Sequence, residues 1–170
     1  MRYLLTAALL IFFFSCKKKK ETVRASEVST ASIEPSVSSA SSLNGDSLLY
    51  YFERTPCFGQ CPIFKLSIYD SGYSIYEGRN FVDRIGTYQS NGDLASLHKI
   101  KQVADSIQYF SFDSLYDNPN LMDFPSKIII IKDQGEKKKV VARVKAPKSL
   151  EVLYRAFDDY IDAQKWKPKQ

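Results

Sequence analysis

Two runs of alternating apolar and polar residues around a turn signal require this chain to contain a β-hairpin. The runs are Ile63 to Tyr69 and Tyr73 to Glu77, and Asp70-Ser71-Gly72 separates them. A period of two places every second side chain on the same face of a strand, and glycine supplies the positive φ that tight turns need. We expect a hairpin here, and further strands at Ser47 to Glu53 and Phe81 to Gln89.

Two later segments carry the period of amphipathic helices. The first runs from about Asp93 to Phe110, and the second starts at Pro147, because proline is tolerated at the first helical position. The apolar stripes that define them are Leu94, Leu97, Ile100, Ala104 and Ile107 in the first, and Leu150, Leu153, Tyr154, Phe157 and Ile161 in the second.

A second hairpin is expected between these helices, after a loop from Ser111 to Pro125. Lys127 to Lys132 encloses four successive isoleucines, which favours a strand buried on both faces, and a turn leads into Lys137 to Lys145. The predicted class is α+β: an antiparallel sheet of about six strands in the order ββββ-α-ββ-α, with two helices packed on one face.

The N-terminus has the pattern of an export signal. Arg2 precedes an apolar run from Tyr3 to Phe14, and Ser15 precedes Cys16. The run is well short of the roughly 20 residues that span a bilayer, so a secretory peptide is favoured over a transmembrane helix. The segment resembles the bacterial lipoprotein signal, which implies that residues 1–15 are removed and that Cys16 carries a lipid.

The next residues predict a tether. Lys17 to Lys20 would bind anionic headgroups, and Glu21 to about Gly45 is Ser-rich without a hydrophobic period, as in disordered linkers. Its flexible reach is on the order of 28 Å. We therefore assign residues 16–45 to the anchor and linker and residues 46–170 to one α+β domain. Lys17 beside Cys16 resembles outer-membrane lipoproteins, so we expect a lipid-anchored envelope protein facing the periplasm.

The charge distribution argues against a nucleic-acid partner. The chain has a formal net charge of +5, but residues 46–170 contain 18 Lys and Arg against 16 Asp and Glu, a net of +2. A nucleic-acid binder concentrates basic charge on its folded domain.

The remaining cysteines form an even pair once Cys16 is lipidated. Export favours a disulfide between Cys57 and Cys61. A redox pair is the alternative, although the spacing is C-x3-C and no βαβ pattern surrounds it. A metal site is not predicted, because His98 is the single histidine and two thiols alone are too few ligands for zinc. No cofactor or catalytic residue is predicted either.

The segment Arg54-Thr-Pro-Cys-Phe-Gly-Gln-Cys-Pro62 resembles the R-T-x-C-x-G-x-C-P motif of a family of short Bacteroidota-type lipoproteins that carry a domain of unknown function. Three further family features are similar to Asp70-Ser-Gly72, Tyr116…Asp123-Phe-Pro125 and Ala146-Pro147. The resemblance covers roughly residues 46–166. It implies a domain assignment and carries over no activity.

Four residues are candidates for binding. Arg54 can clamp a ligand carboxylate or pair with an internal acid such as Asp123, and Asp123 can serve a ligand or only its local turn. If a two-residue turn pairs Tyr69 with Ser74, then Tyr69 and Tyr76 are diagonal neighbours on an open face of the sheet, where they can bind glycan or peptide.

The function that we predict is a membrane-anchored envelope lipoprotein whose domain is a non-enzymatic binding module for a protein, peptide or glycan. Two alternatives stay open. One is a thiol-disulfide exchange enzyme that uses Cys57 and Cys61, and the other is an inhibitor of an envelope hydrolase.

Overall fold

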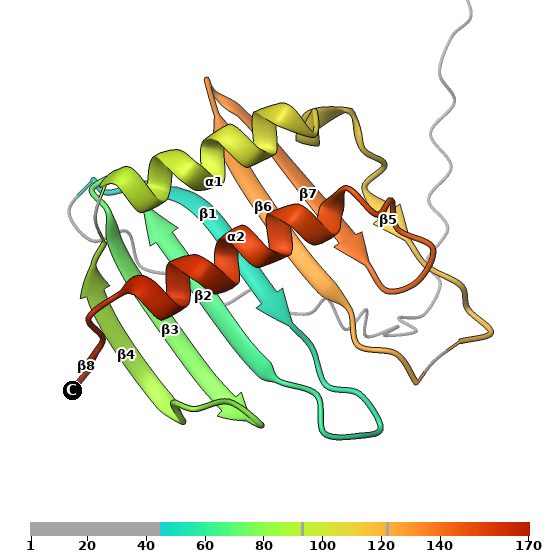
Figure 1. The fold of residues 1–170 in the computed structure, drawn as a ribbon, viewed down its shortest axis with the longest axis horizontal. Helices are drawn as coiled ribbons and strands as arrows, with labels where there is room; N and C mark the ends of the chain where they lie inside the picture. The colour runs from blue at the N-terminus through green and yellow to red at the C-terminus, as the bar shows by residue number, and fades with distance from the viewer. Residues whose placement is uncertain (1–44, 93, 122) are drawn as a thin grey trace, which may run out of the picture. The chain divides into compact units, whose positions relative to one another are not determined.

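A computed structural model describes residues 45–92, 94–121 and 123–170. Within these ranges the chain forms one eight-stranded sheet and two α-helices, and both helices lie on the same side of the sheet (Figure 1). None of the helices in this part of the chain has the length and apolarity needed to cross a membrane. The predicted signal peptide, Cys16 and most of the linker lie outside the described residues.

The elements follow one another as β1 (Leu48–Arg54), β2 (Ile63–Tyr69), β3 (Tyr73–Asn80), β4 (Gly86–Asn91), α1 (Leu94–Ser106), the 3-10 turn η1 (Tyr109–Ser111), β5 (Leu115–Tyr116), β6 (Lys127–Asp133), β7 (Glu136–Ala142), α2 (Leu150–Ala163) and β8 (Lys167–Pro168). The order across the sheet is β5-β7-β6-β1-β2-β3-β4-β8. All neighbouring strands are antiparallel except β5, which runs parallel to β7.

The predicted order ββββ-α-ββ-α is present, but the predicted number of about six strands is too low. The two extra strands, β5 and β8, have two residues each and lie at the edges of the sheet. Neither is long enough to show a hydrophobic period, so each is recognised as a strand only by its hydrogen bonds to a neighbouring strand. The structure therefore corrects both the strand count and the purely antiparallel topology.

Two predicted boundaries are also corrected. The first helix ends at Ser106, because Gln108 has a left-handed backbone (φ 55°) that breaks the helix before η1. The fourth strand begins at Gly86, and residues 81–85 form a loop that precedes it.

The first hairpin has a register one residue away from the predicted one. Gly72 (φ 85°) closes a tight turn in which its N–H donates to the Tyr69 carbonyl at 2.9 Å. Ile68 then pairs with Ser74, and Leu66 pairs with Tyr76. Since side chains alternate between faces, this single step moves Tyr76 to the side of the sheet that faces the helices.

The isoleucine strand is buried on one face only. Ile129 and Ile131 on β6 are 1% and 2% exposed, whereas Ile128 and Ile130 on the other face are half-buried. The prediction of burial on both faces is wrong, because α1 and α2 cover the same face of the sheet (Figure 1).

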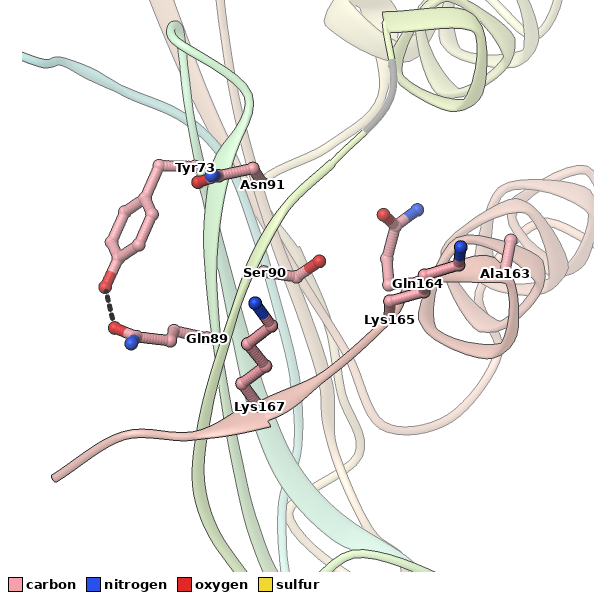
Figure 2. Close-up of a pocket in the computed structure, with 8 residues that line it drawn as sticks. All are labelled: Tyr73, Gln89, Ser90, Asn91, Ala163, Gln164, Lys165 and Lys167. Carbon is pink, nitrogen blue, oxygen red and sulfur yellow. Dashed lines mark hydrogen bonds between the residues drawn. The ribbon is translucent and has the colours of Figure 1, made fainter.

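The edge strand β8 returns the chain from α2 to the sheet. It pairs with Tyr88 and Gln89 of β4, and Figure 2 shows Lys167 of β8 alongside that strand. Ser90 and Asn91 continue β4 beyond these pairs. Ser90 pairs with Ser74 on the face covered by the helices, and Asn91 pairs with Tyr73 on the other face.

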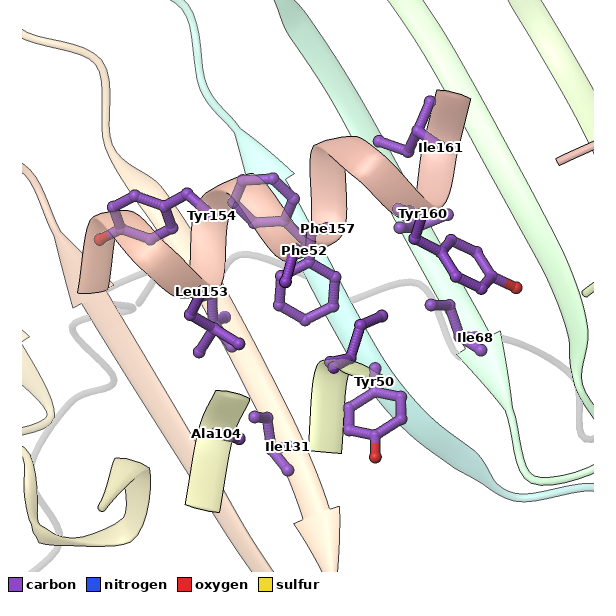
Figure 3. Packing of buried hydrophobic residues seen from close by; sticks show 14 of the residues in the cluster. Tyr50, Phe52, Ile68, Ala104, Ile131, Leu153, Tyr154, Phe157, Tyr160 and Ile161 are labelled. Atoms are coloured by element: carbon purple, nitrogen blue, oxygen red, sulfur yellow. The ribbon is translucent and has the colours of Figure 1, made fainter. Parts of the chain in front are cut away.

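The core lies between the helices and the sheet and is rich in aromatic rings (Figure 3). Phe52 of β1 is fully buried and stacks on Phe157 of α2 with 5.0 Å between ring centroids, and it also stacks on Tyr154. Burying each such ring contributes about 1.5–3 kcal/mol to stability. Buried polar contacts also cross this layer: the hydroxyls of Ser74 and Tyr160 lie 2.6 Å apart, and the Tyr109 hydroxyl donates to the Ile129 carbonyl at 3.0 Å.

Candidate binding surface at the loop end

Four loops leave the sheet at one end, and three of them carry large exposed apolar side chains. Antiparallel register places the end of β1 beside the starts of β2 and β6, because Arg54 pairs with both Phe64 and Lys127. The same register places the end of β3 beside the start of β4, and the end of β7 beside the start of β6. The three apolar loops are residues 55–62, residues 81–85 and the described residues of 117–126, and we call this surface the loop end. It forms the lower edge of the sheet in Figure 1. The fourth loop, residues 143–149, leads from β7 to α2.

A disulfide constrains the first of these loops. Cys57 and Cys61 form the predicted bond, with 5.9 Å between their Cα atoms. The backbone N–H of Gly59 donates to Cys57 Sγ at 3.2 Å. Phe58 lies inside this small ring of residues, and its side chain is 91% exposed. The disulfide thus holds a large apolar side chain out into solvent.

The loop that precedes β6 is fastened to the disulfide loop. The Thr55 N–H donates to the Ser126 carbonyl at 3.0 Å, and the Ser126 N–H donates to Thr55 Oγ1 at 2.7 Å. Ser126 is buried, so these hydrogen bonds are shielded from water. The two loops consequently act as one surface.

The loop end is unusually apolar for exposed protein. Among the described residues, eight large apolar side chains are exposed, and five of them belong to these three loops. They are Phe58, Phe81 (51%), Ile85 (59%), Leu121 (40%) and Phe124 (51%). Scattered exposed apolar residues are normal, but a gathering on adjacent loops marks an interaction surface.

The loop between β3 and β4 holds one of these rings in a strained backbone conformation. Phe81 has a φ of 53°, which is uncommon for a bulky residue and costs of order 1–3 kcal/mol. The loop folds back tightly on β3, since a Cβ added at Gly78 would lie 1.8 Å from the Arg84 carbonyl oxygen. The surrounding structure therefore fixes Phe81 in its exposed position.

Arg54, a candidate for ligand binding or for an internal ion pair, pairs within the fold. Its Nη2 donates to Asp158 Oδ2 on α2 at 2.5 Å. The guanidinium carbon also lies 5.5 Å from the Phe52 ring centroid and 5.6 Å from that of Phe64, within cation–π range. Burial raises the pKa of Asp158, and the Arg54 charge opposes this shift. Arg54 thus joins β1 to α2 beside the disulfide loop.

A small hollow of about 260 Å³ lies next to this ion pair. Its walls carry both signs of charge, from Arg54 and Arg84 and from Asp158 and Asp162. Tyr76 lies at its base, where burial raises the pKa of its hydroxyl to about 12. The hollow opens beside Phe81, so it continues the loop end with polar groups.

The other predicted binding residues have different outcomes. Asp123 is exposed in the loop before β6, and Arg54 pairs with Asp158 in its place. The prediction that Tyr69 and Tyr76 form an exposed tyrosine face is wrong, since each is 3% exposed. The Tyr76 ring packs 5.5 Å from Phe64 and 5.6 Å from Trp166.

The single histidine and the potential metal ligands do not form a further site among the described residues. His98 is exposed on α1, and the described residues include no group of three or more potential metal ligands. The exposed rings at positions 58, 81 and 124 were missed, because an aromatic residue in a loop looks the same in sequence whether it packs inward or outward. The flanking cysteines around Phe58 were the available signal.

Fold and surface together define a small α+β domain with one open, helix-backed sheet and a disulfide-tied apolar loop end. The chain belongs to the family described as a domain of unknown function (DUF6438), whose model matches residues 49–161. The match runs from β1 into α2 and includes the disulfide loop. The expected membership in a family of unknown function is confirmed. No curated protein and no solved structure matches the chain.

Proposed function

We propose that this chain is a lipid-anchored envelope protein whose domain is a non-enzymatic binding module, and that it binds a protein partner through the loop end. The single observation that carries the proposal is the disulfide-held Phe58, 91% exposed among other exposed rings. Aromatic anchors that fill apolar pockets dominate protein interfaces, and a rigid loop loses little conformational entropy on binding.

The point at which the chain enters the domain is suitable for a tethered module. The Ser47 N–H donates to Asp70 Oδ1 in the turn between β2 and β3, so the chain enters β1 at the end of the sheet opposite the loop end. An anchor at Cys16 would therefore attach to the domain on the side away from the exposed rings.

Site-specific photocrosslinking in intact cells tests the proposal. A photoreactive phenylalanine analogue replaces Phe58 in the full chain, and the control places it at Val152, which is 43% exposed on α2. The proposal expects one discrete adduct from position 58 that disappears when Phe124→Ser is added, and no such adduct from position 152. Equal adducts from both positions, or an adduct that Phe124→Ser leaves unchanged, would contradict it.

Thiol-disulfide exchange is the second candidate, and one contact favours it. The Gly59 N–H that donates to Cys57 Sγ at 3.2 Å would also stabilise a thiolate there, and thiolates are the reactive form of cysteine. This candidate expects reduction by thioredoxin-strength reductants while the domain stays folded. A bond that yields only after unfolding rules it out.

A further inference from the structure

A second hollow lies where β8 leaves the edge of the sheet uncovered. It has a volume of about 500 Å³ and is bounded by the last residues of β4 and by the chain that leaves α2. Figure 2 shows the side chains around this gap, which we call the edge pocket. Its volume is in the range of small-molecule sites. It lies at the opposite end of β4 from the loop end, so it is a separate surface.

The walls of the edge pocket consist largely of hydrogen-bond donors. Among the described residues that line it, none is acidic. The amides are Gln89, Asn91 and Gln164, the hydroxyls are Tyr73 and Ser90, and the cations are Lys165 and Lys167. A wall with this composition suits a ligand rich in acceptor oxygens and carrying negative charge.

A hydrogen bond between two lining residues orients one donor for such a ligand. The Tyr73 hydroxyl donates to Gln89 Oε1 at 2.9 Å. This bond uses the acceptor atom of the Gln89 amide and leaves its nitrogen as a donor, because a side-chain amide has one oxygen and one NH₂ group.

Gln164 contributes a nearly buried amide to the edge pocket. The residue follows α2 directly, is 9% exposed and lines the pocket. Its Nε2 is buried with no hydrogen-bond partner, and Figure 2 shows its amide oxygen on the side of Ser90. This oxygen can accept a hydrogen bond from a ligand hydroxyl.

The position of the pocket restricts the charge of the ligand. It lies at the C-terminal end of α2, where the helix dipole is negative and disfavours anions. Lys165 and Lys167 offset that field for a single negative charge. A dianion such as phosphate usually binds at helix N-termini or between arginines, and the described lining contains neither.

We infer that the edge pocket binds a monosaccharide or short oligosaccharide that bears a carboxylate, of the hexuronate type. The lysines bind the carboxylate, and the amides and Ser90 bind ring hydroxyls and the ring oxygen. This inference does not depend on the loop end or on a protein partner.

Tryptophan fluorescence provides the measurement. Trp166 is the only tryptophan, and it lies between Lys165 and Lys167 with its Nε1 donating to the Ile161 carbonyl at 2.7 Å. The full chain is titrated with galacturonate, and with galactose, which differs only in having a hydroxymethyl group in place of the carboxylate. The expected result is a saturable change with galacturonate and binding at least about tenfold weaker with galactose, because the charge-assisted bonds are lost.

Variants locate the binding. Lys167→Gln and Gln164→Leu are each expected to weaken galacturonate binding about tenfold. Lys137→Gln, which removes the same charge from an exposed position on β7, is expected to leave it unchanged. Thermal unfolding of every variant shows whether the fold is intact, and Gln164→Leu keeps the test valid if Lys167→Gln disturbs β8.

Three results would overturn the inference. The first is the absence of any saturable response to galacturonate. The second is an equal response to galactose or to sodium phosphate, which would mean nonselective association. The third is unchanged affinity in a folded Gln164→Leu variant, which would place the response elsewhere on the molecule.

Discussion

Arg54 and Asp158 are separated by 104 residues in the chain, yet their side chains form the ion pair that joins the end of β1 to α2. The pair lies where the disulfide loop leaves the sheet, with the guanidinium over the rings of Phe52 and Phe64. Of the two roles expected for Arg54, a ligand clamp or an internal ion pair, the structure shows the internal pair, which helps to hold the base of the proposed binding surface.

Removing the Arg54 charge tests this role. Arg54→Met keeps much of the apolar packing but leaves the carboxylate of Asp158 without its partner. We expect a loss of about 1–2 kcal/mol in the free energy of unfolding, since the Arg54 side chain is only 21% exposed. Lys99→Met breaks the exposed pair with Asp159 and should cost less than about 0.5 kcal/mol. Urea unfolding compares the two, and equal losses would contradict the role of Arg54.

The pKa of Asp158 leads to a pH dependence of stability. Because burial raises this pKa above its ordinary value of 3.8, the folded domain binds the proton more tightly than the unfolded chain does. The contribution of Asp158 to stability therefore falls as pH rises from 3.8 through the raised pKa. We expect Asp158→Asn to gain stability relative to the parent chain across that interval. A relative loss there would mean that attraction by Arg54 outweighs burial.

The disulfide should stabilise the domain modestly. It closes a very short loop, so the double variant Cys57→Ser with Cys61→Ser should lose about 2 kcal/mol by the chain-entropy model. Phe58 would then lose its fixed position, and partner binding should weaken more than the loss of stability explains. Thermal unfolding and binding measured together check this. Full binding by the folded double serine variant would show that the bond does not present Phe58.

Gly78 should tolerate no side chain. In Gly78→Ala the new Cβ would meet the Arg84 carbonyl at 1.8 Å, and backbone atoms cannot move as a flexible side chain can. We expect a loss of at least about 1–3 kcal/mol and a shifted 81–85 loop. Gly59→Ala is the matched control, since its Cβ would lie 3.9 Å from its nearest contact, Cys57 Sγ. Chemical shifts of residues 79–86 report the difference, and similar behaviour of both variants would contradict the geometry.

Lipidation at Cys16 is a prediction from the sequence and is tested by metabolic labelling with palmitate. The parent chain should incorporate label and fractionate with membranes, because diacylation provides stable anchoring together with Lys17 to Lys20. Cys16→Ala should lose the label, whereas Cys57→Ser with Cys61→Ser should keep it. A parent chain that incorporates no label would contradict lipidation at Cys16.

The sequence predicted the class of fold because the long elements carry strong periods. The alternation in residues 63–77 and the apolar stripe of residues 150–161 are enough to place a hairpin and a closing helix. Strands β5 and β8 were missed because two-residue strands depend on hydrogen bonds to neighbours.

The candidate site was harder to predict, since it depends on register and distant contacts. A three-residue loop in place of a two-residue turn moved Tyr76 from the open face into the core. The partner of Arg54 was expected at Asp123 and lies at Asp158, because the packing of α2 on the sheet decides which carboxylate comes close. Local sequence does not contain that information.

The most direct test of the proposed function compares two serine substitutions in copurification from crosslinked cells. Phe58→Ser and Val152→Ser each remove one exposed apolar side chain, the first from the loop end and the second from α2. Our account predicts that the partner captured by the parent chain is retained by Val152→Ser and reduced at least about tenfold by Phe58→Ser, with both variants folded. Retention of that partner by Phe58→Ser would contradict the account.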